Sequence, residues 1–247
     1  MKNKKHLISV ITVSFNAVKT IEQTILSVIN QTYPNIEYII IDGGSTDGTI
    51  DIIKKYQDKI AYWISEPDKG IYDAMNKGID SANGDYLFFL GADDELSSIG
   101  IIEDIFDEIK SYPILIYGNV KYQNCKKNIH SQFSKKILLH NTIHHQSAFY
   151  HKNLFTNFRY NTYFKIASDY ELNLKIYLNK KSQTHYVDKV VSICTDNGVS
   201  RSNAFLAQKE MFKVRKLYFN QIQNIILDAI ATLKFKIHYI YKKLKNV

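Results

Sequence analysis

Short apolar runs alternate with segments of helical periodicity through the first hundred residues of the chain. The stretches 7–14 and 37–42 are rich in Ile and Val without polar alternation, which is typical of strands covered on both faces of a parallel sheet. The same reasoning predicts further strands at 61–65 and 86–90, and helices at 21–29, 50–53 and 71–82. Strands that alternate with helices indicate βαβ units, and therefore an α/β fold built on an open, mostly parallel sheet with flanking helices.

The second half of the chain has a less regular pattern. A polar, His-rich segment up to His151 shows no clear periodicity. Around it the pattern predicts strands at 114–118 and 183–193, and a helix at 164–179. Because there is no internal repeat and no Pro/Gly-rich linker, we expect one domain over residues 1–208, with halves at about 1–119 and 120–208, followed by a helical tail over 209–247.

The tail carries most of the net charge of +8. It contains nine basic and two acidic residues, whereas residues 1–208 contain 23 basic and 22 acidic residues. Apolar residues recur at steps of three and four from Ile222 to Leu244 and form one continuous stripe accompanied by lysines. This pattern suits an interfacial helix on anionic lipid, and its alternative is a helix packed on its own domain or on a second subunit of a homodimer.

Composition narrows the classes that remain. A chain of 247 residues with 45% apolar and 23% charged residues is not disordered. Cys125 and Cys194 have neither metal-ligand nor disulfide-framework spacing, which favours a reducing compartment. The start MKNKKHLISVITVSF imitates a signal peptide but lacks a small-residue cleavage site, and no stretch approaches the ~20 apolar residues of a membrane span. We therefore expect a cytoplasmic protein.

The candidate chemistry lies at the strand ends, because ligands of open α/β sheets bind outside the carboxyl ends of the strands. The residues that follow the four predicted strands include Ser14, Asp42, Asp68, Asp93 and Asp94. They form an acidic crevice. It has neither Gly-x-Gly-x-x-Gly nor Gly-x-x-x-x-Gly-Lys-Ser/Thr, so neither a dinucleotide-binding dehydrogenase nor a P-loop NTPase is supported.

Asp93 and Asp94 are adjacent carboxylates at the mouth of a buried strand. Two such charges repel by about 4 kcal/mol at 4 Å when the effective dielectric constant is about 20. Mg²⁺ or Mn²⁺, bound with phosphate oxygens and water, would relieve that repulsion. The alternative is a solvated turn in which one aspartate caps the next helix. Asp42 has a similar alternative as a turn former before two glycines, whereas Asp47 is interpreted as a helix cap.

At these residues the chain resembles the family 2 glycosyltransferases, inverting enzymes of GT-A fold with a Rossmann-like sheet. Five blocks follow one another in the order of that family over residues 7–96: SVITVSFN, QTYP, EYIIIDGGSTDGT, EPDKGIYDAMNKGI and ANGDYLFFLGADDEL. A weaker continuation is ASDYEL at 167–172, where the family has its catalytic acidic residue at the start of a helix. The resemblance implies a metal-dependent hexosyltransferase that uses a nucleotide sugar, usually a UDP-sugar.

The resemblance also implies roles for individual residues of the half at 1–119, which would bind the nucleotide sugar. Asp42 would hold the uracil, and Ser14 would lie beside the nucleotide. Asp73 would sit near the donor, and Asp93 on the ribose and sugar side. Asp94 would bind the Mg²⁺ or Mn²⁺ ion that holds the diphosphate.

In the acceptor half, at 120–208, Asp169 would be the base that deprotonates the acceptor hydroxyl. Glu171 is a weaker candidate, because two residues further along a helix it faces elsewhere. His144 and His145 are favoured as part of a polar loop, although His145 is a candidate near the metal or acceptor. Arg201 is a candidate diphosphate contact, or simply a surface cation.

The chain lacks the Gln-x-x-Arg-Trp motif of processive synthases, so transfer of a single sugar is favoured over polymerisation. The leading hypothesis is synthesis of a bacterial surface polysaccharide or glycolipid, on a glycan or lipid-linked acceptor, at the inner face of the cytoplasmic membrane. A sugar nucleotidyltransferase would need a Gly-rich basic loop after the first strand, which SFNAVKT is not. A non-enzymatic module that binds lipid or nucleic acid would draw only on the tail, and the near-neutral body argues against nucleic acid.

Overall fold

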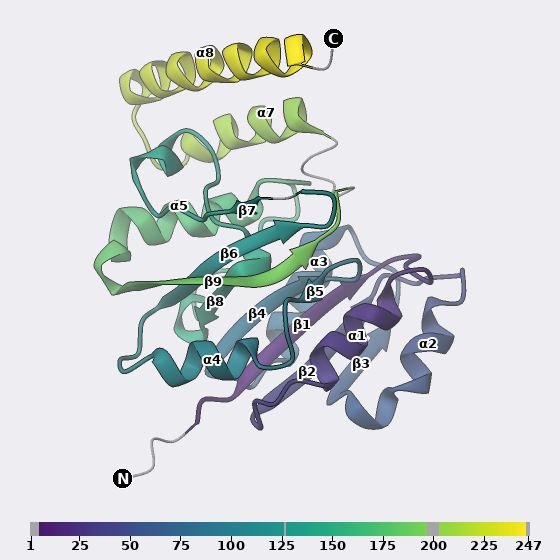
Figure 1. Ribbon diagram of the computed structural model, residues 1–247. Coiled ribbons are helices and arrows are strands. Elements are labelled where there is room, and N and C mark those ends of the chain that lie inside the picture. The colour runs from purple at the N-terminus through teal and green to yellow at the C-terminus, as the bar shows by residue number, and fades with distance from the viewer. Residues whose placement is uncertain (1–4, 126, 197–202, 246–247) are drawn as a thin grey trace.

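The computed structural model of the protein describes residues 5–125, 127–196 and 203–245, and Figure 1 shows their arrangement. Within these ranges nine strands form one sheet. Their spatial order is β3 (Tyr62–Ser65), β2 (Ile36–Asp42), β1 (Ile8–Ser14), β4 (Tyr86–Gly91), β8 (Ala148–His151), β6 (Leu115–Tyr122), β9 (Thr184–Cys194) and β5 (Glu95–Leu96), with β7 (Asn128–Ile129) paired to β6.

The half of the sheet formed by β1 to β4 is parallel, as the sequence predicts. β1 lies between β2 and β4, and both of its faces are covered, which explains its continuous Ile/Val run. Side chains alternate between the two faces, so that Ile39 and Ile41 enter one core cluster and Ile40 enters the other. The four strands therefore all present their carboxyl ends at the same edge.

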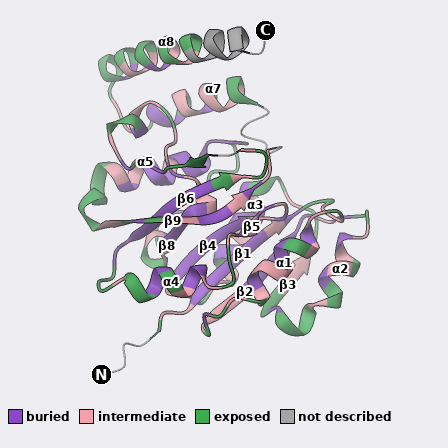
Figure 2. Cartoon of the chain, in the orientation of Figure 1, coloured by how far each residue is buried: buried purple, intermediate pink, exposed green. Residues whose placement is uncertain are grey.

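Helices cover both faces of the sheet, and Figure 2 shows the strands largely buried between them. α1 (Ile21–Ile29) and α4 (Ile101–Glu108) pack into one core cluster, with α2 (Thr49–Lys55) beside α1. α3 (Ile71–Ser81) and α5 (Ser168–Lys180) pack into the other. Five short 3₁₀ helices complete the described connections: η1 (Gln57–Lys59), η2 (Lys135–Leu138), η3 (His145–Ser147), η4 (Lys152–Leu154) and η5 (Lys181–Gln183).

The other half of the sheet is mixed. β8 runs antiparallel to both β4 and β6, whereas β9 runs parallel to β6 and antiparallel to β5. Because β8 opposes β4, the residues that precede β8 lie at the carboxyl end of β4. In this way the polar segment of the second half, which has no periodicity in the sequence, reaches the edge where the parallel strands end.

The tail consists of two helices, α7 (Ala204–Arg215) and α8 (Gln221–Lys245), drawn at the top of Figure 1. α7 packs on α5, and α8 packs on α7 through an ion pair between Arg215 and Asp228 at 2.7 Å. The expected domain boundary after Gln208 therefore falls inside α7. Among the described residues, no helix is both long enough and apolar enough to cross a membrane.

α5 begins at Ser168 and not at 164, where the sequence pattern places the start of this helix. The preceding residues 165–167 direct their backbone N–H groups at the carboxylate of Glu210 on α7. Apolar spacing cannot reveal this boundary, because a tertiary contact determines it. α4 and the short strand β5 were not predicted either.

Candidate active site

The carboxylates of Asp93 and Asp94 lie directly beyond the end of β4, in a turn in which Asp94 N donates to Gly91 O at 3.1 Å. Both side chains fold back over Gly91. A Cβ atom at Gly91 would lie 2.8 Å from Asp94 Oδ2 and 3.0 Å from Asp93 Oδ1, so a larger residue here would displace the two carboxylates. The strand end therefore concentrates two negative charges in one place.

Two other segments surround the pair. Gln146 Nε2 and the Thr195 backbone N–H donate to Asp94 at 3.1 and 3.2 Å, and the Thr195 hydroxyl donates to Asp93 at 2.5 Å. Burial, followed by the charge of Asp93, raises the pKa of Asp94 to about 6. The two carboxylates therefore lie close enough for the charge of Asp93 to disfavour ionisation of Asp94.

The donor set at this pair fits a hard divalent cation that also binds phosphate. Among the described residues, no cluster of three or more His, Cys, Asp or Glu side chains could hold a metal ion without help. Asp94 is only 4% exposed, and its ionised form is disfavoured by the charge beside it. A cation here would therefore need the oxygens of a bound diphosphate, which is the usual way in which Mg²⁺ is held at phosphate sites.

Asp169 lies in the first turn of α5 and is 8% exposed. Its Oδ1 accepts from the Tyr72 hydroxyl at 3.1 Å and from the Tyr170 backbone N–H at 2.8 Å, and its Oδ2 accepts from Asn141 Nδ2 at 2.9 Å. Burial and the charge of Asp169 raise the pKa of Tyr72 well above its ordinary value, so its hydroxyl remains a donor. The carboxylate is held in one orientation by three elements.

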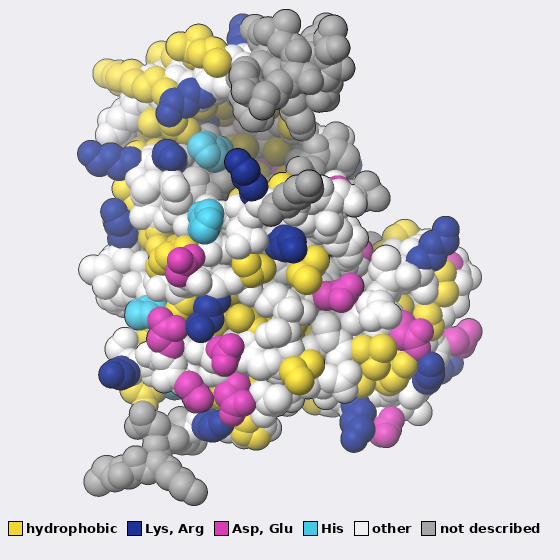
Figure 3. Space-filling view, in the orientation of Figure 1, with side chains coloured by type: hydrophobic (Ala, Val, Ile, Leu, Met, Phe, Trp, Pro, Cys, Tyr) yellow, Lys and Arg dark blue, Asp and Glu magenta, His cyan; other side chains and the backbone are white. Residues whose placement is uncertain are grey.

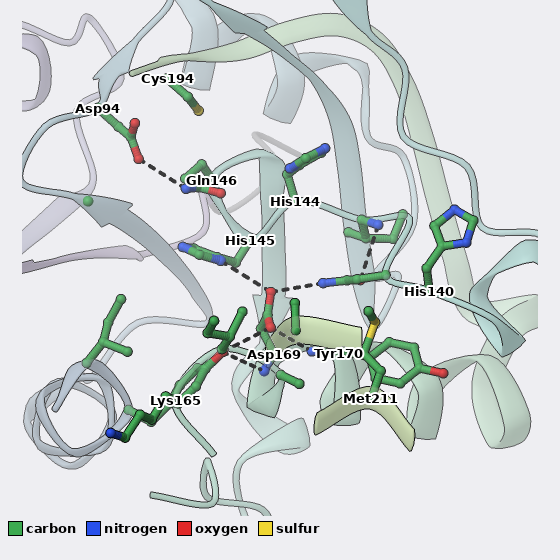
Figure 4. A pocket seen from close by; sticks show the side chains of 18 of the residues that line it. Asp94, His140, His144, His145, Gln146, Lys165, Asp169, Tyr170, Cys194 and Met211 are labelled. Atoms are coloured by element: carbon green, nitrogen blue, oxygen red, sulfur yellow. Dashed lines mark hydrogen bonds and ion pairs between the residues drawn. The ribbon is translucent and has the colours of Figure 1, made fainter. Parts of the chain in front are cut away.

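One cavity of about 370 Å³ joins Asp169 to the pair Asp93 and Asp94. Figure 4 shows Gln146 and His145 between Asp94 and Asp169, with Met211 and Tyr170 at the other end. His145 Nδ1 lies 3.5 Å from Asp169 Oδ2, so this histidine belongs to the cavity wall and not merely to a polar loop. The apolar end of the cavity is lined by Ile143, Ile166, Ala167, Tyr170, Ala207 and Met211.

Asp42 and Ser14 form a separate cluster at the ends of β2 and β1. Asp42 is fully buried and accepts five hydrogen bonds, from the hydroxyls of Ser14, Ser45 and Ser65 and from the backbone N–H groups of Gly44 and Ser45. Burial raises the pKa of Asp42, but the hydrogen bonds outweigh burial and hold it below its ordinary value. The carboxylate is therefore ionised and rigidly placed.

The remaining candidates lie elsewhere. Asp73, in the first turn of α3, accepts from the Lys69 backbone N–H at 3.0 Å. Glu171 is bonded by the Tyr218 hydroxyl at 3.2 Å and is not among the residues that line the cavity. Asp47 accepts from the Thr49 backbone N–H at 3.0 Å, but the N-cap residue of α2 is Gly48, so Asp47 lies one residue before the position expected for the cap. Arg201 lies outside the described residues.

The sequence reasoning gave no role to Tyr72, Asn141, Gln146 and Thr195, which bind the carboxylates of the cavity. Tyr72 and Gln146 each adjoin a candidate that was named, Asp73 and His145. Position beside a candidate is a weak signal. Asn141 lies in a segment without periodicity, whereas Thr195 follows the strand predicted at 183–193, to which the strand-end rule was not applied. Only the strand pairing brings those two segments to the end of β4.

A sheet whose parallel half ends in paired carboxylates, and whose mixed half brings a third carboxylate into the same cavity, has the GT-A fold of glycosyltransferases. The sequence model described as "Glycosyl transferase family 2" matches residues 9–170. The chain belongs to this family and is a glycosyltransferase. The resemblance seen in the sequence blocks is thus confirmed.

A relative from Mycobacterium bovis (strain BCG / Pasteur 1173P2), named "PGL/p-HBAD biosynthesis glycosyltransferase", is 30% identical over 214 residues. The match covers 84% of this chain and 83% of the relative. It extends well beyond the family match and therefore includes part of the second half of the chain.

Among solved structures, S. aureus TarS 1-349 in complex with UDP-GlcNAc has a TM-score of 0.70 and 21% identity, over 92% of this chain and 71% of that one. The match spans only 42% of the longer TarS chain. Glucosyl-3-phosphoglycerate synthase from Mycobacterium tuberculosis, in complex with Mn²⁺, UDP and phosphoglyceric acid, has a TM-score of 0.62 and 15% identity, over 87% of this chain and 80% of that one. These likenesses establish the fold.

Proposed function

We propose that the protein transfers a single hexose, with inversion, from a UDP-sugar to a hydroxyl of a glycan or lipid-linked acceptor. The observation that carries this proposal is the cavity that joins Asp93 and Asp94 to Asp169. One end has the chemistry to hold a diphosphate through a cation, and the other has a fixed carboxylate able to take a proton. A sugar bound between them would be open to attack from the side opposite its diphosphate.

The reaction proposed is one displacement. The acceptor oxygen forms a bond to the anomeric carbon while the bond from that carbon to the diphosphate breaks, and UDP leaves with the electron pair. Asp169 takes the acceptor proton, and attack opposite the leaving group inverts the anomeric centre. Asn141, Tyr72 and Tyr170 N–H keep the carboxylate aimed into the cavity throughout.

The donor would be held by the ends of β1, β2 and β4. In this proposal Asp94 holds the Mg²⁺ or Mn²⁺ ion, which when bound offsets the charge that develops on the leaving diphosphate. Asp93 lies on the ribose and sugar side, and Asp73 lies near the donor. Asp42 and Ser14 bind the uracil. Because three serine hydroxyls already donate to the Asp42 carboxylate, one of these hydrogen bonds has to break before the carboxylate can accept from the uracil.

Donor choice supplies the direct test. Isothermal titration with UDP-, GDP- and dTDP-sugars, with and without Mn²⁺, is expected to give binding of the UDP compounds in Mn²⁺. On incubation the bound donors are expected to release UDP by hydrolysis, in which water replaces the acceptor hydroxyl and takes the hexose. UDP is chosen because the similar structures of TarS and of glucosyl-3-phosphoglycerate synthase are complexes with UDP-GlcNAc and UDP. Exclusive binding of a GDP- or dTDP-sugar would overturn the donor assignment, and the absence of any turnover would overturn the activity.

Replacing Asp42 by Asn is expected to weaken UDP binding about tenfold, the order of one charge-assisted hydrogen bond. The amide oxygen can still accept from the Gly44 and Ser45 N–H groups, but the amide NH₂ replaces the oxygen that accepts from the Ser14 and Ser45 hydroxyls, and the negative charge is lost. Titration with UDP in Mn²⁺ measures the loss. Asp47→Asn in the same loop is the matched control and should bind UDP as the wild type does. Equal affinity of Asp42→Asn and the control would contradict the base-binding role.

The tail supports docking of the enzyme on an anionic membrane, where a lipid-linked acceptor would be presented. Helix α8 exposes an apolar stripe, visible as the hydrophobic surface at the top of Figure 3: Ile222, Ile225, Ile226, Ile230, Leu233 and Ile237. Lys234 and Lys236 are exposed in the same helix. Polybasic segments gain about 1 kcal/mol per Lys or Arg near such a surface, and the stripe adds burial that salt does not screen.

The double variant Ile226→Gln and Leu233→Gln is expected to lose sedimentation with phosphatidylglycerol vesicles, because it removes apolar area and leaves the charge unchanged. These side chains are 54% and 61% exposed, so folding should be preserved. Ile99→Gln, at a side chain that is 62% exposed just before α4 and outside the tail, is the control. If the wild type ignores the vesicles and dimerises through α8, the stripe is a protein interface.

The relative from M. bovis is named for PGL/p-HBAD biosynthesis, and it supports a place for this chain in glycolipid or surface-polysaccharide synthesis. With an acceptor of that kind, the enzyme works at the inner face of the cytoplasmic membrane. Family membership favours this reading over a sugar nucleotidyltransferase or a non-enzymatic binding module.

A further inference from the structure

Glu210, on helix α7, is a buried carboxylate that none of the steps above uses. It is 5% exposed. Its Oε2 accepts from the backbone N–H groups of Lys165, Ile166 and Ala167 at 3.1, 2.8 and 3.1 Å, and its Oε1 accepts from Lys165 N–H at 3.0 Å. One side chain of the tail thus gathers three successive backbone donors of another segment.

Those three donors immediately precede the helix that carries the base. Ala167 is the N-cap residue of α5, and with an alanine side chain it cannot supply a cap of its own. The N-terminal N–H groups of a helix have no partner within the helix, and the positive end of its dipole favours an anion. The Glu210 carboxylate therefore caps the N–H of the N-cap residue Ala167 from α7, and it also binds the two N–H groups that precede this residue.

The cap lies two residues from Asp169. Oδ1 of Asp169 accepts from the Tyr170 N–H of the same turn, so the orientation of this carboxylate depends on where the first turn of α5 begins. Arg215, also on α7, donates to Leu139 O at 3.1 Å, just before Asn141, which bonds the other oxygen of Asp169. Helix α7 thus contacts the segment that leads to the base and also the segment that leads to one of its partners.

We infer that Glu210 is a positioning residue for the catalytic base: it fixes the start of α5 so that the Asp169 carboxylate stays aimed at the acceptor hydroxyl. The inference rests on the proposed role of Asp169. It makes α7 a part of the catalytic unit and not a detachable anchor. Glu210 lies outside residues 9–170, the part that matches the family model.

The test uses Glu210→Gln in the full chain, with Glu37→Gln as the matched control. The glutamine keeps the size of the side chain but replaces one accepting oxygen by a donor and removes the charge. Glu37 also accepts a backbone N–H, from Asn83 at 2.8 Å, but it lies at the amino end of β2, away from the cavity. Both variants thus lose a carboxylate that binds backbone.

Three measurements are made on each protein. They are UDP release from UDP-glucose, UDP-galactose and UDP-N-acetylglucosamine in Mn²⁺, the dissociation constant for UDP in Mn²⁺, and hydrogen exchange of the peptide that spans residues 162–172. Glu210→Gln is expected to slow UDP release at least about tenfold, since misplacement of a catalytic group by about 1 Å costs on the order of 100-fold. The UDP constant should stay within about twofold, and exchange of the 162–172 peptide should accelerate. Glu37→Gln should change none of the three.

A purely structural role would give a different result. A Glu210→Gln protein that exchanges faster at 162–172 yet releases UDP at the wild-type rate would overturn the inference, and so would unchanged exchange. If the glutamine variant does not fold, Glu210→Asp decides: the retained charge should restore part of the rate, and a full wild-type rate would overturn the positioning role. If the wild-type protein itself releases no UDP from the three donors, the proposed function fails, and the exchange data alone still decide whether Glu210 holds the start of α5.

Discussion

Replacing Asp169 by Asn should abolish sugar transfer, with turnover lowered by about 10²- to 10⁴-fold, the range in which a positioned general base contributes. The amide keeps the shape of the carboxylate but cannot take the acceptor proton. Asp94 lies on the opposite side of His145 and Gln146 from Asp169, so nucleotide affinity should be unchanged (Figure 4). Release of UDP and titration with UDP in Mn²⁺ measure the two quantities separately.

The control for this prediction is Glu171→Gln. Glu171 lies in the same turn of α5, but the Tyr218 hydroxyl binds it and it does not line the cavity. Burial raises its pKa, so a neutral glutamine should fit its site without loss of fold. Its turnover is expected to match the wild type. An Asp169→Asn protein that kept most of its turnover would show that a different residue is the base, and loss of turnover in Glu171→Gln would identify that residue.

The parallel half of the fold and its site were accessible from the sequence because both follow from local pattern. A strand buried on both faces has an unbroken apolar run in the sequence. Because ligands of open α/β sheets bind at the carboxyl ends of the strands, the residues that follow such a run are the candidates for the site. Asp93 and Asp94 were selected in this way, and in the structure Asp94 is buried beside the charge of Asp93. Asp42 is likewise rigidly placed, although it is already saturated with hydrogen bonds.

The mixed half was less accessible, because pairing over long distances creates it. Gln146 meets Asp94 only because β8 inserts antiparallel beside β4, and Thr195 meets it only because β9 ends at the same edge. Neither of these strand arrangements produces a periodic pattern in the sequence. The start of α5 was misplaced for a related reason, since Glu210 holds the N–H groups of 165–167 from a helix that lies some forty residues further on.

The parallel and mixed halves of the sheet have different proposed roles in the enzyme. The parallel half has the residues proposed to bind the nucleotide, and it coincides with the five sequence blocks at 7–96. The mixed half and α7 hold Asp169 and the apolar end of the cavity, where acceptors of different chemistry have to be accommodated. Tertiary contacts such as those of Glu210 and Arg215 hold the segments around the base in this half.

The second large effect is expected at Asp94, where Asp94→Ala and Asp94→Asn should each lower the affinity for a UDP-sugar in Mn²⁺ by at least about 100-fold. A metal ligand that also neutralises a diphosphate contributes several kcal/mol, and 1.4 kcal/mol corresponds to a factor of ten. Titration of the wild type in EDTA should show the same loss. Asp104→Ala, at an exposed carboxylate on α4, is the control and should bind normally. Unchanged wild-type affinity in EDTA would contradict the metal assignment.

Asp94→Asn should at the same time stabilise the protein when no metal is bound. Burial and the charge of Asp93 raise the pKa of Asp94 to about 6, so at pH 7 the ionised side chain is disfavoured in the folded state. Between its ordinary pKa and about 6 the folded protein binds more protons than the unfolded chain, and the free energy of unfolding therefore falls as the pH rises through that window. The neutral amide removes this penalty, and each kcal/mol regained should raise the melting temperature by about 2–4 °C. If Asp94 is a metal ligand, Asp94→Asn should raise the melting temperature in EDTA and lose Mn²⁺-dependent binding of the UDP-sugar. If Asp94 is only a structural carboxylate, the same substitution should lower both the melting temperature and the affinity for the UDP-sugar.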